Sequence, residues 1–145
     1  MKWKLLASDG QKSFALVFAT GDEVVAGLES FARENGLTAG QFTAIGAFQD
    51  VTLGYFDWET KGYEEIPVRE QVEVLSLVGD VALADGEPQV HAHVVVGKSD
   101  GTAHGGHLLT GHVRPTLELI LVEPPEHLRK ETDPETGLAL IRLDA

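Results

Sequence analysis

Three histidines at short, regular spacing carry the clearest chemical signal in this sequence. His91 and His93 are two residues apart in an apolar segment, and His107 follows after a turn at residues 98–101. Residues i and i+2 of a β-strand point to the same face, about 6.5–7 Å apart along it. The spacing therefore predicts two imidazoles side by side, and imidazole is a common ligand of zinc.

The turn between the two histidine-bearing strands decides whether the third imidazole joins the other two. A three-residue loop at 99–101 is a common hairpin class and sets His93 opposite His107, with Cβ atoms about 4.5–5.5 Å apart. A two-residue loop at 100–101 would turn His107 away unless the glycines at 105–106 held a bulge. The first register brings three nitrogens together and leaves an open fourth position, as a reactive zinc site requires.

The remaining histidines are weaker candidates. His104 falls by strand parity on the face opposite His107, His112 is interpreted as structural, and His127 carries no signal. The simplest alternative is a hairpin with surface histidines and no metal. Because a third histidine matches the register, we favour the metal site. The chain has no cysteine, so any metal must be held by histidine and carboxylate.

An enzyme would need further groups beside such a metal. Glu73 and Glu118 are candidate general acids or bases, because both sit in otherwise apolar strands, where a carboxyl group can shuttle protons. Arg114 is a candidate ligand of an anionic substrate. The alternatives are structural. Glu73 and Glu118 would then lie on a solvated face or pair across strands with Arg69 or Arg114, and Arg114 would cap a sheet edge or make a subunit contact.

Length and charge narrow the classes of function. The 145 residues predict a single domain spanning 1–145, and the net charge of −12 disfavours binding to DNA by this chain alone. The eleven basic residues are scattered and form no run longer than 129–130. No apolar stretch is long enough for a signal peptide or a membrane span, which predicts a cytoplasmic protein with no membrane partner.

Strands with one strong helix predict an α+β fold on a largely antiparallel sheet. Thr20 and Glu23 fit a capping box that starts the helix, and Gly36 ends it. Gly79 suggests a bend in the chain, and residues 85–88 are expected to be an irregular loop. The strands are predicted at 13–19, 41–48, 51–57, 63–68, 71–78, 113–123 and 138–143, the last after a polar, loop-like stretch at 126–136.

Five segments match a known family in order along the chain: GDEVVAGLESFARENGL, TAIGAFQDVTLGYFD, EVLSLVGDVAL, HAHVVVGKSDGTAHGGHLLTGHV and TLELILVE. The chain resembles the plants-and-prokaryotes-conserved (PPC) domain. That resemblance implies a homotrimer. It also implies that His91, His93 and His107 bind a metal, which is expected to be Zn²⁺. The family is described as DNA-binding. The AT-hook of its plant members is not present here. At the level of fold alone, the three-histidine hairpin is also similar to the metal site of acetolactate decarboxylase.

We therefore expect a homotrimeric, zinc-binding PPC-domain protein that binds a small-molecule ligand or has a regulatory role, rather than an enzyme. The alternative is a metal-dependent enzyme, hydrolase or decarboxylase-like, acting on small carboxylates or esters. A third possibility, binding to DNA, is what the family description suggests, but it agrees poorly with the net charge of −12.

Overall fold

The computed structural model describes residues 1–124 and 128–143, which hold one helix and nine strands. In chain order they are β1 (Lys2–Ala7), β2 (Lys12–Ala19), α1 (Val24–Glu34), β3 (Ala39–Asp57), β4 (Gly62–Val68), β5 (Val72–Ala84), β6 (Glu87–Gly97), β7 (Ala103–Glu123), β8 (Arg129–Thr132) and β9 (Ala139–Arg142). Within these residues, no helix has the length and apolar content needed to cross a membrane.

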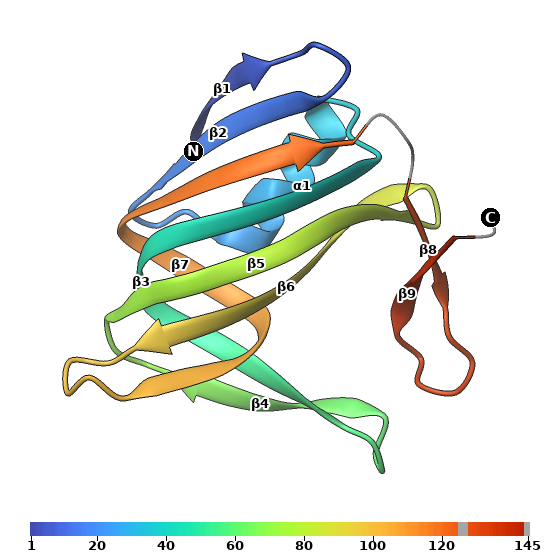
Figure 1. Ribbon diagram of the computed structural model, residues 1–145. Helices are drawn as coiled ribbons and strands as arrows, with labels where there is room; N and C mark the ends of the chain where they lie inside the picture. Colours follow the sequence, from blue (N-terminus) through green and yellow to red (C-terminus); the bar gives the residue numbers. More distant parts are fainter. Residues whose placement is uncertain (125–127, 144–145) are drawn as a thin grey trace.

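The sheet closes on itself around β7. β7 pairs with β3, β3 pairs with β5, and β6 pairs with both β5 and β7, so that four long strands form a ring of antiparallel neighbours. β2 pairs with the C-terminal half of β7, and β1 pairs with β2 at the edge of the sheet (Figure 1). Among the described residues the one parallel pairing joins β5 to β8. The predicted α+β fold with a largely antiparallel sheet is confirmed.

Helix α1 lies behind the sheet and supplies its apolar face to the core (Figure 1). Val24, Leu28 and Phe31 are buried against strand residues in one continuous apolar cluster. The predicted end at Gly36 is confirmed, with φ at +63°. The predicted capping box is wrong: the cap is Glu23, whose carboxylate accepts hydrogen bonds from two backbone N–H groups of the first turn, while the Thr20 hydroxyl turns to a carbonyl on β7.

Several predicted strands are longer than expected. The segments 41–48 and 51–57 form one strand, β3, because shifts in register around Phe48–Asp50 absorb the polar residues between them. β5 runs straight through Gly79: a Cβ there would lie 2.5 Å from the carbonyl oxygen of His91, so the glycine permits close strand packing rather than a bend. β7 joins the third histidine and the predicted strand at 113–123 in one element.

Two segments predicted as loops are hairpins. Asp85 and Gly86 form a tight two-residue turn with positive φ values, 52° and 83°, which pairs Ala84 with Glu87. In the polar stretch predicted as a loop, residues 126 and 127 lie outside the described residues, but 129–132 form β8, which pairs with β9. The predicted strand at 138–143 corresponds to β9.

Candidate metal centre

The β6–β7 hairpin has the three-residue loop that the histidine register requires. The backbone N–H of Lys98 donates to the carbonyl of Thr102 at 2.9 Å, and Gly101 adopts a φ of +83°. From this turn the pairing continues without a shift to His93 and His107, which lie directly opposite each other.

His91, His93 and His107 form one cluster, in which a ligand atom from each ring lies within 4.8 Å of the others. The Nε2 atoms of His91 and His93 are 3.3 Å apart. Zinc–nitrogen bonds of about 2.0–2.1 Å in a tetrahedron separate two ligand nitrogens by roughly 3.3–3.4 Å. The residues present therefore fit a tetrahedral metal ion.

The surroundings of His107 and His93 favour the neutral form that a metal ligand needs. Burial lowers the pKa of His107 to about 4, and the positive charges of His91, His93 and Lys130 add to the effect. Burial also lowers the pKa of His93, and the neighbouring His91 lowers it further.

Contacts at Nδ1 leave the Nε2 atoms of two rings free to face a metal. Nδ1 of His107 lies 3.3 Å from the Tyr63 hydroxyl, and the two rings overlap with centroids 4.6 Å apart. Gly54, opposite His107, makes room for this contact, because a Cβ there would lie 2.8 Å from the Tyr63 ring. On the other side, Nδ1 of His91 lies 3.6 Å from Oδ2 of Asp80. Such outer contacts orient metal-binding imidazoles.

A cavity of about 160 Å³ opens beside the cluster. His91, His107 and Tyr63 line one side, and the C-terminal hairpin supplies Lys130 and residues 138–140. Sequence reasoning did not identify Tyr63, Asp80 or Lys130 as part of this site. For Asp80 a signal exists, because a two-residue turn at Asp85-Gly86 pairs Asp80 with His91; Lys130 and Tyr63 carry none.

The other candidate residues lie away from the histidines. Glu118 and Arg114 follow His107 on β7 by eleven and seven residues, roughly 36 and 23 Å along a strand. Glu73 pairs with Gly97 at the far end of β6. His104 is exposed and pairs with Val96, and His112 contacts Asp50 at 2.7 Å.

Comparisons with known proteins find the same overall fold in several solved structures. A metal-containing protein from Archaeoglobus fulgidus is 34% identical, with 98% of this chain and 99% of that chain covered and a TM-score of 0.84. A plant- and prokaryote-conserved (PPC) protein from Pyrococcus horikoshii is 32% identical, with coverages of 97% and 94% and a TM-score of 0.85. A candidate DNA-binding protein from Bacteroides thetaiotaomicron is 26% identical, with 99% of both chains covered and a TM-score of 0.88.

Two further likenesses differ in kind from these. The bifunctional protein GlmU of Synechococcus sp. (strain JA-3-3Ab) is 30% identical over 142 residues, which are 96% of this chain, although the chain spans only 22% of that protein. Acetolactate decarboxylase from Bacillus subtilis is 14% identical, with coverages of 90% and 60% and a TM-score of 0.56, and shares the fold alone. The model of the Plants and Prokaryotes Conserved (PCC) domain matches residues 6–125, and the chain belongs to that family.

Proposed function

We propose that this protein binds a zinc ion through His91, His93 and His107 and uses its open coordination position to hold a small ligand. The observation that carries the proposal is the convergence of three ligand atoms within 4.8 Å on a register-fixed hairpin. Three neutral imidazoles suit zinc, and three protein ligands leave a fourth position for water or a ligand. A ligand bound there would enter the cavity beside His107.

A binding role is favoured over an enzymatic one because the residues predicted for catalysis lie away from the histidines, and the carboxylate that does lie beside them, Asp80, is already paired with Lys130. Hydrolysis or decarboxylation of a small carboxylate or ester at the metal needs a proton-transfer group within hydrogen-bond reach. Glu73 and Glu118 lie elsewhere on the sheet, and Arg114 borders a separate hollow with Asp50 and Arg69.

Binding to DNA is not part of the proposal. The net charge is −12, and several of the basic side chains already have carboxylate partners. These are Lys12, Arg33, Lys98, Lys130 and Arg142. Phosphate binding draws its affinity from free Lys and Arg on one surface.

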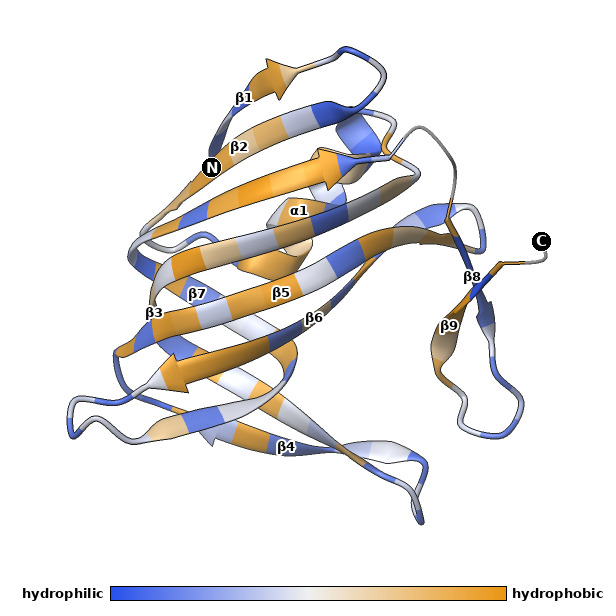
Figure 2. Ribbon diagram, in the orientation of Figure 1, coloured by the Kyte–Doolittle hydropathy of each residue, from blue (hydrophilic) through white to orange (hydrophobic). Residues whose placement is uncertain are grey.

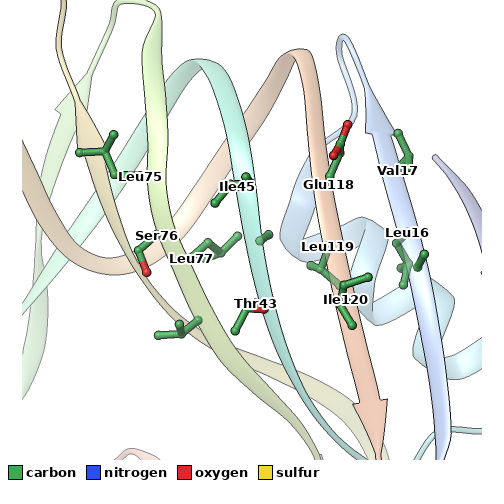
Figure 3. Close-up of a pocket in the computed structure, with 13 residues that line it drawn as sticks. Leu16, Val17, Thr43, Ile45, Leu75, Ser76, Leu77, Glu118, Leu119 and Ile120 are labelled. Carbon is green, nitrogen blue, oxygen red and sulfur yellow. The ribbon is translucent and has the colours of Figure 1, made fainter.

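We further propose that the protein is a homotrimer, as the resemblance to the family implies. An apolar face, defined here as Val17, Ile45, Leu75, Val78 and Ile120, lies on the side of the sheet away from α1 and is exposed in the single chain (Figures 2 and 3). Ile45 is 62% exposed and Leu75 54%. Glu118 lies among these side chains, opposite Val17 and Ile45. The exposed apolar side chains gathered around it mark an interaction site, and further copies of the chain would cover it.

Elemental analysis of the purified, untagged protein tests the metal proposal. We expect about one zinc per chain, lost in His107→Ala and kept in His104→Ala, whose side chain is exposed on the other face. A fully folded wild-type protein that holds no metal, and takes up none from added Zn²⁺, would overturn the proposal.

A further inference from the structure

The C-terminal hairpin of β8 and β9 lies beside the histidine cluster, beyond the part of the chain that the family model covers. The match ends at residue 125, whereas β8 begins at Arg129 (Figure 1). β8 is joined to the main sheet by parallel pairing with Leu83 and Ala84 at the end of β5. This pairing brings Lys130 towards the metal-binding strands.

Lys130 and Asp80 form an ion pair whose two contacting atoms are buried, although the Asp80 side chain as a whole is 26% exposed. The Lys130 side chain is only 2% exposed, and its Nζ lies 2.7 Å from Oδ1 of Asp80. Both atoms are sealed from solvent, and neither has another hydrogen-bond partner among the described residues. A buried ion pair seldom adds stability over well-packed apolar side chains of similar size. Stability alone is therefore a poor reason for this pair.

The second oxygen of the same carboxylate faces the metal site. Oδ2 of Asp80 lies 3.6 Å from Nδ1 of His91, and the far side of that ring, Nε2, lies 3.3 Å from Nε2 of His93. A carboxylate at Nδ1 keeps the proton there, orients the ring and leaves the Nε2 lone pair for a metal. Lys130, Asp80 and His91 thus form one continuous line of contacts that ends at the metal position.

We propose that the β8–β9 hairpin completes the metal site, with Lys130 as a positioning residue that fixes Asp80 behind His91. The inference rests on the proposed metal function. It assigns a role in the site to a segment outside the matched family domain, and the same hairpin forms the outer wall of the cavity with Leu138 and Leu140. Sequence differences in this hairpin would then change the metal affinity of a related protein and the size of the ligand that can enter the cavity.

The test is zinc affinity, measured by competition with a chromophoric chelator, together with the visible spectrum of the Co²⁺-loaded protein. We expect Lys130→Met to weaken zinc binding about 10- to 100-fold and to change the Co²⁺ spectrum. Lys130→Arg, which keeps the positive charge, should restore both to within a few-fold of the wild type. The matched control is Glu131→Gln, which breaks the exposed pair with Arg142 on the same hairpin and should change neither.

The double variant Asp80→Asn/Lys130→Met guards against misfolding, because Lys130→Met alone leaves a buried carboxylate without its partner. It should fold, as shown by cooperative unfolding in excess chelator, and bind zinc as weakly as the single variant. Wild-type affinity in the folded variants would overturn the role of Lys130 and leave the metal site intact. A wild-type protein that takes up no zinc would instead overturn the proposed function, and this inference with it.

Discussion

His93 and His107 are directly opposed residues of β6 and β7, five residue pairs from the turn that joins the strands. Their alignment is set by the hydrogen bond from the Lys98 N–H to the Thr102 carbonyl and by the positive φ of Gly101. The cluster is therefore a consequence of local hairpin geometry, to which His91 is added by the i, i+2 spacing of a strand. Changes at these positions should act on metal binding first and on the fold second.

The two faces of the hairpin predict opposite results for two histidine substitutions. His93→Ala removes a ring whose Nε2 lies 3.3 Å from that of His91, and we expect zinc binding to be lost. His104→Ala removes an exposed ring opposite Val96, and zinc binding should be unchanged. Isothermal titration of each metal-free variant with zinc measures both, and equal loss in the two would refute this assignment of faces.

Removal of the metal should lower thermal stability. A ligand that binds only the folded state at 100 times its Kd stabilises that state by about 2.7 kcal/mol, or roughly 5–10 °C in Tm for a chain of this size. We expect excess chelator to lower the Tm of the wild type by this order. His107→Ala, which has lost a ligand, should melt at the same temperature with and without chelator.

Stability of the metal-free protein should depend on pH below 6.5. Burial lowers the pKa of His107 to about 4, with help from the charges of His91, His93 and Lys130, whereas the unfolded chain binds this proton near pH 6.5. Between these values the unfolded state holds more protons, so the free energy of unfolding falls as pH falls. The loss is complete near pH 4.

The expected size of this loss is about 1–2 kcal/mol, because His107 is only half-buried and solvent screens part of the shift. Denaturant unfolding in chelator at pH 7, 5.5 and 4.5 measures it. His107→Ala should show a shallower dependence across the same window. An equally steep dependence in that variant would place the titrating group elsewhere.

Much of the site was predictable because its register depends on a short turn. The length of the 99–101 loop is enough to predict that His93 pairs with His107. The end of the helix at Gly36 is predictable for the same reason, because it depends only on neighbouring residues. The pairing of Asp80 with His91 was available by the same counting, from the tight turn at Asp85-Gly86. An irregular loop at 85–88 and a bend at Gly79, which the sequence suggests, both hide this pairing; the structure has a tight turn and a point of close strand approach instead.

The rest depends on long-range packing that local patterns do not encode. Lys130 reaches the site through a parallel pairing between β5 and β8, forty-six residues apart at Ala84 and Lys130. Glu23 replaces Thr20 as the helix cap because its carboxylate also accepts a hydrogen bond from the N–H of Gly111, on β7. Neither contact has a sequence signature.

The apolar face gives a prediction for assembly. Ile45→Asp places a charge at the centre of that face, where the single chain already leaves the side chain 62% exposed, so the folded chain should tolerate it. We expect the proposed trimer to dissociate, because the new carboxylate would lie opposite that of Glu118, and two such charges are costly to bury together at an interface. Light scattering after size exclusion measures the mass. Leu6→Asp, also at an exposed apolar position but on β1, is the control and should leave the mass unchanged.

Gly79 gives the sharpest prediction for the link between fold and site. A Cβ at this position would lie 2.5 Å from the carbonyl oxygen of His91 and 2.5 Å from the ring of Phe42, so Gly79→Ala forces β5 and β6 apart where they position the histidines. We expect a loss of about 1–3 kcal/mol in the free energy of unfolding, as for other overpacked sites, and weaker zinc binding.

The control for this steric argument is Gly62→Ala, at the start of β4. A Cβ there meets only the Thr60 hydroxyl, at 3.9 Å, so neither stability nor zinc affinity should fall measurably. Denaturant unfolding and zinc titration of both variants separate two causes. If Gly79→Ala lost stability but kept full zinc affinity, β5 would not be needed to position His91, and the contact between Asp80 and that ring would have no bearing on the metal.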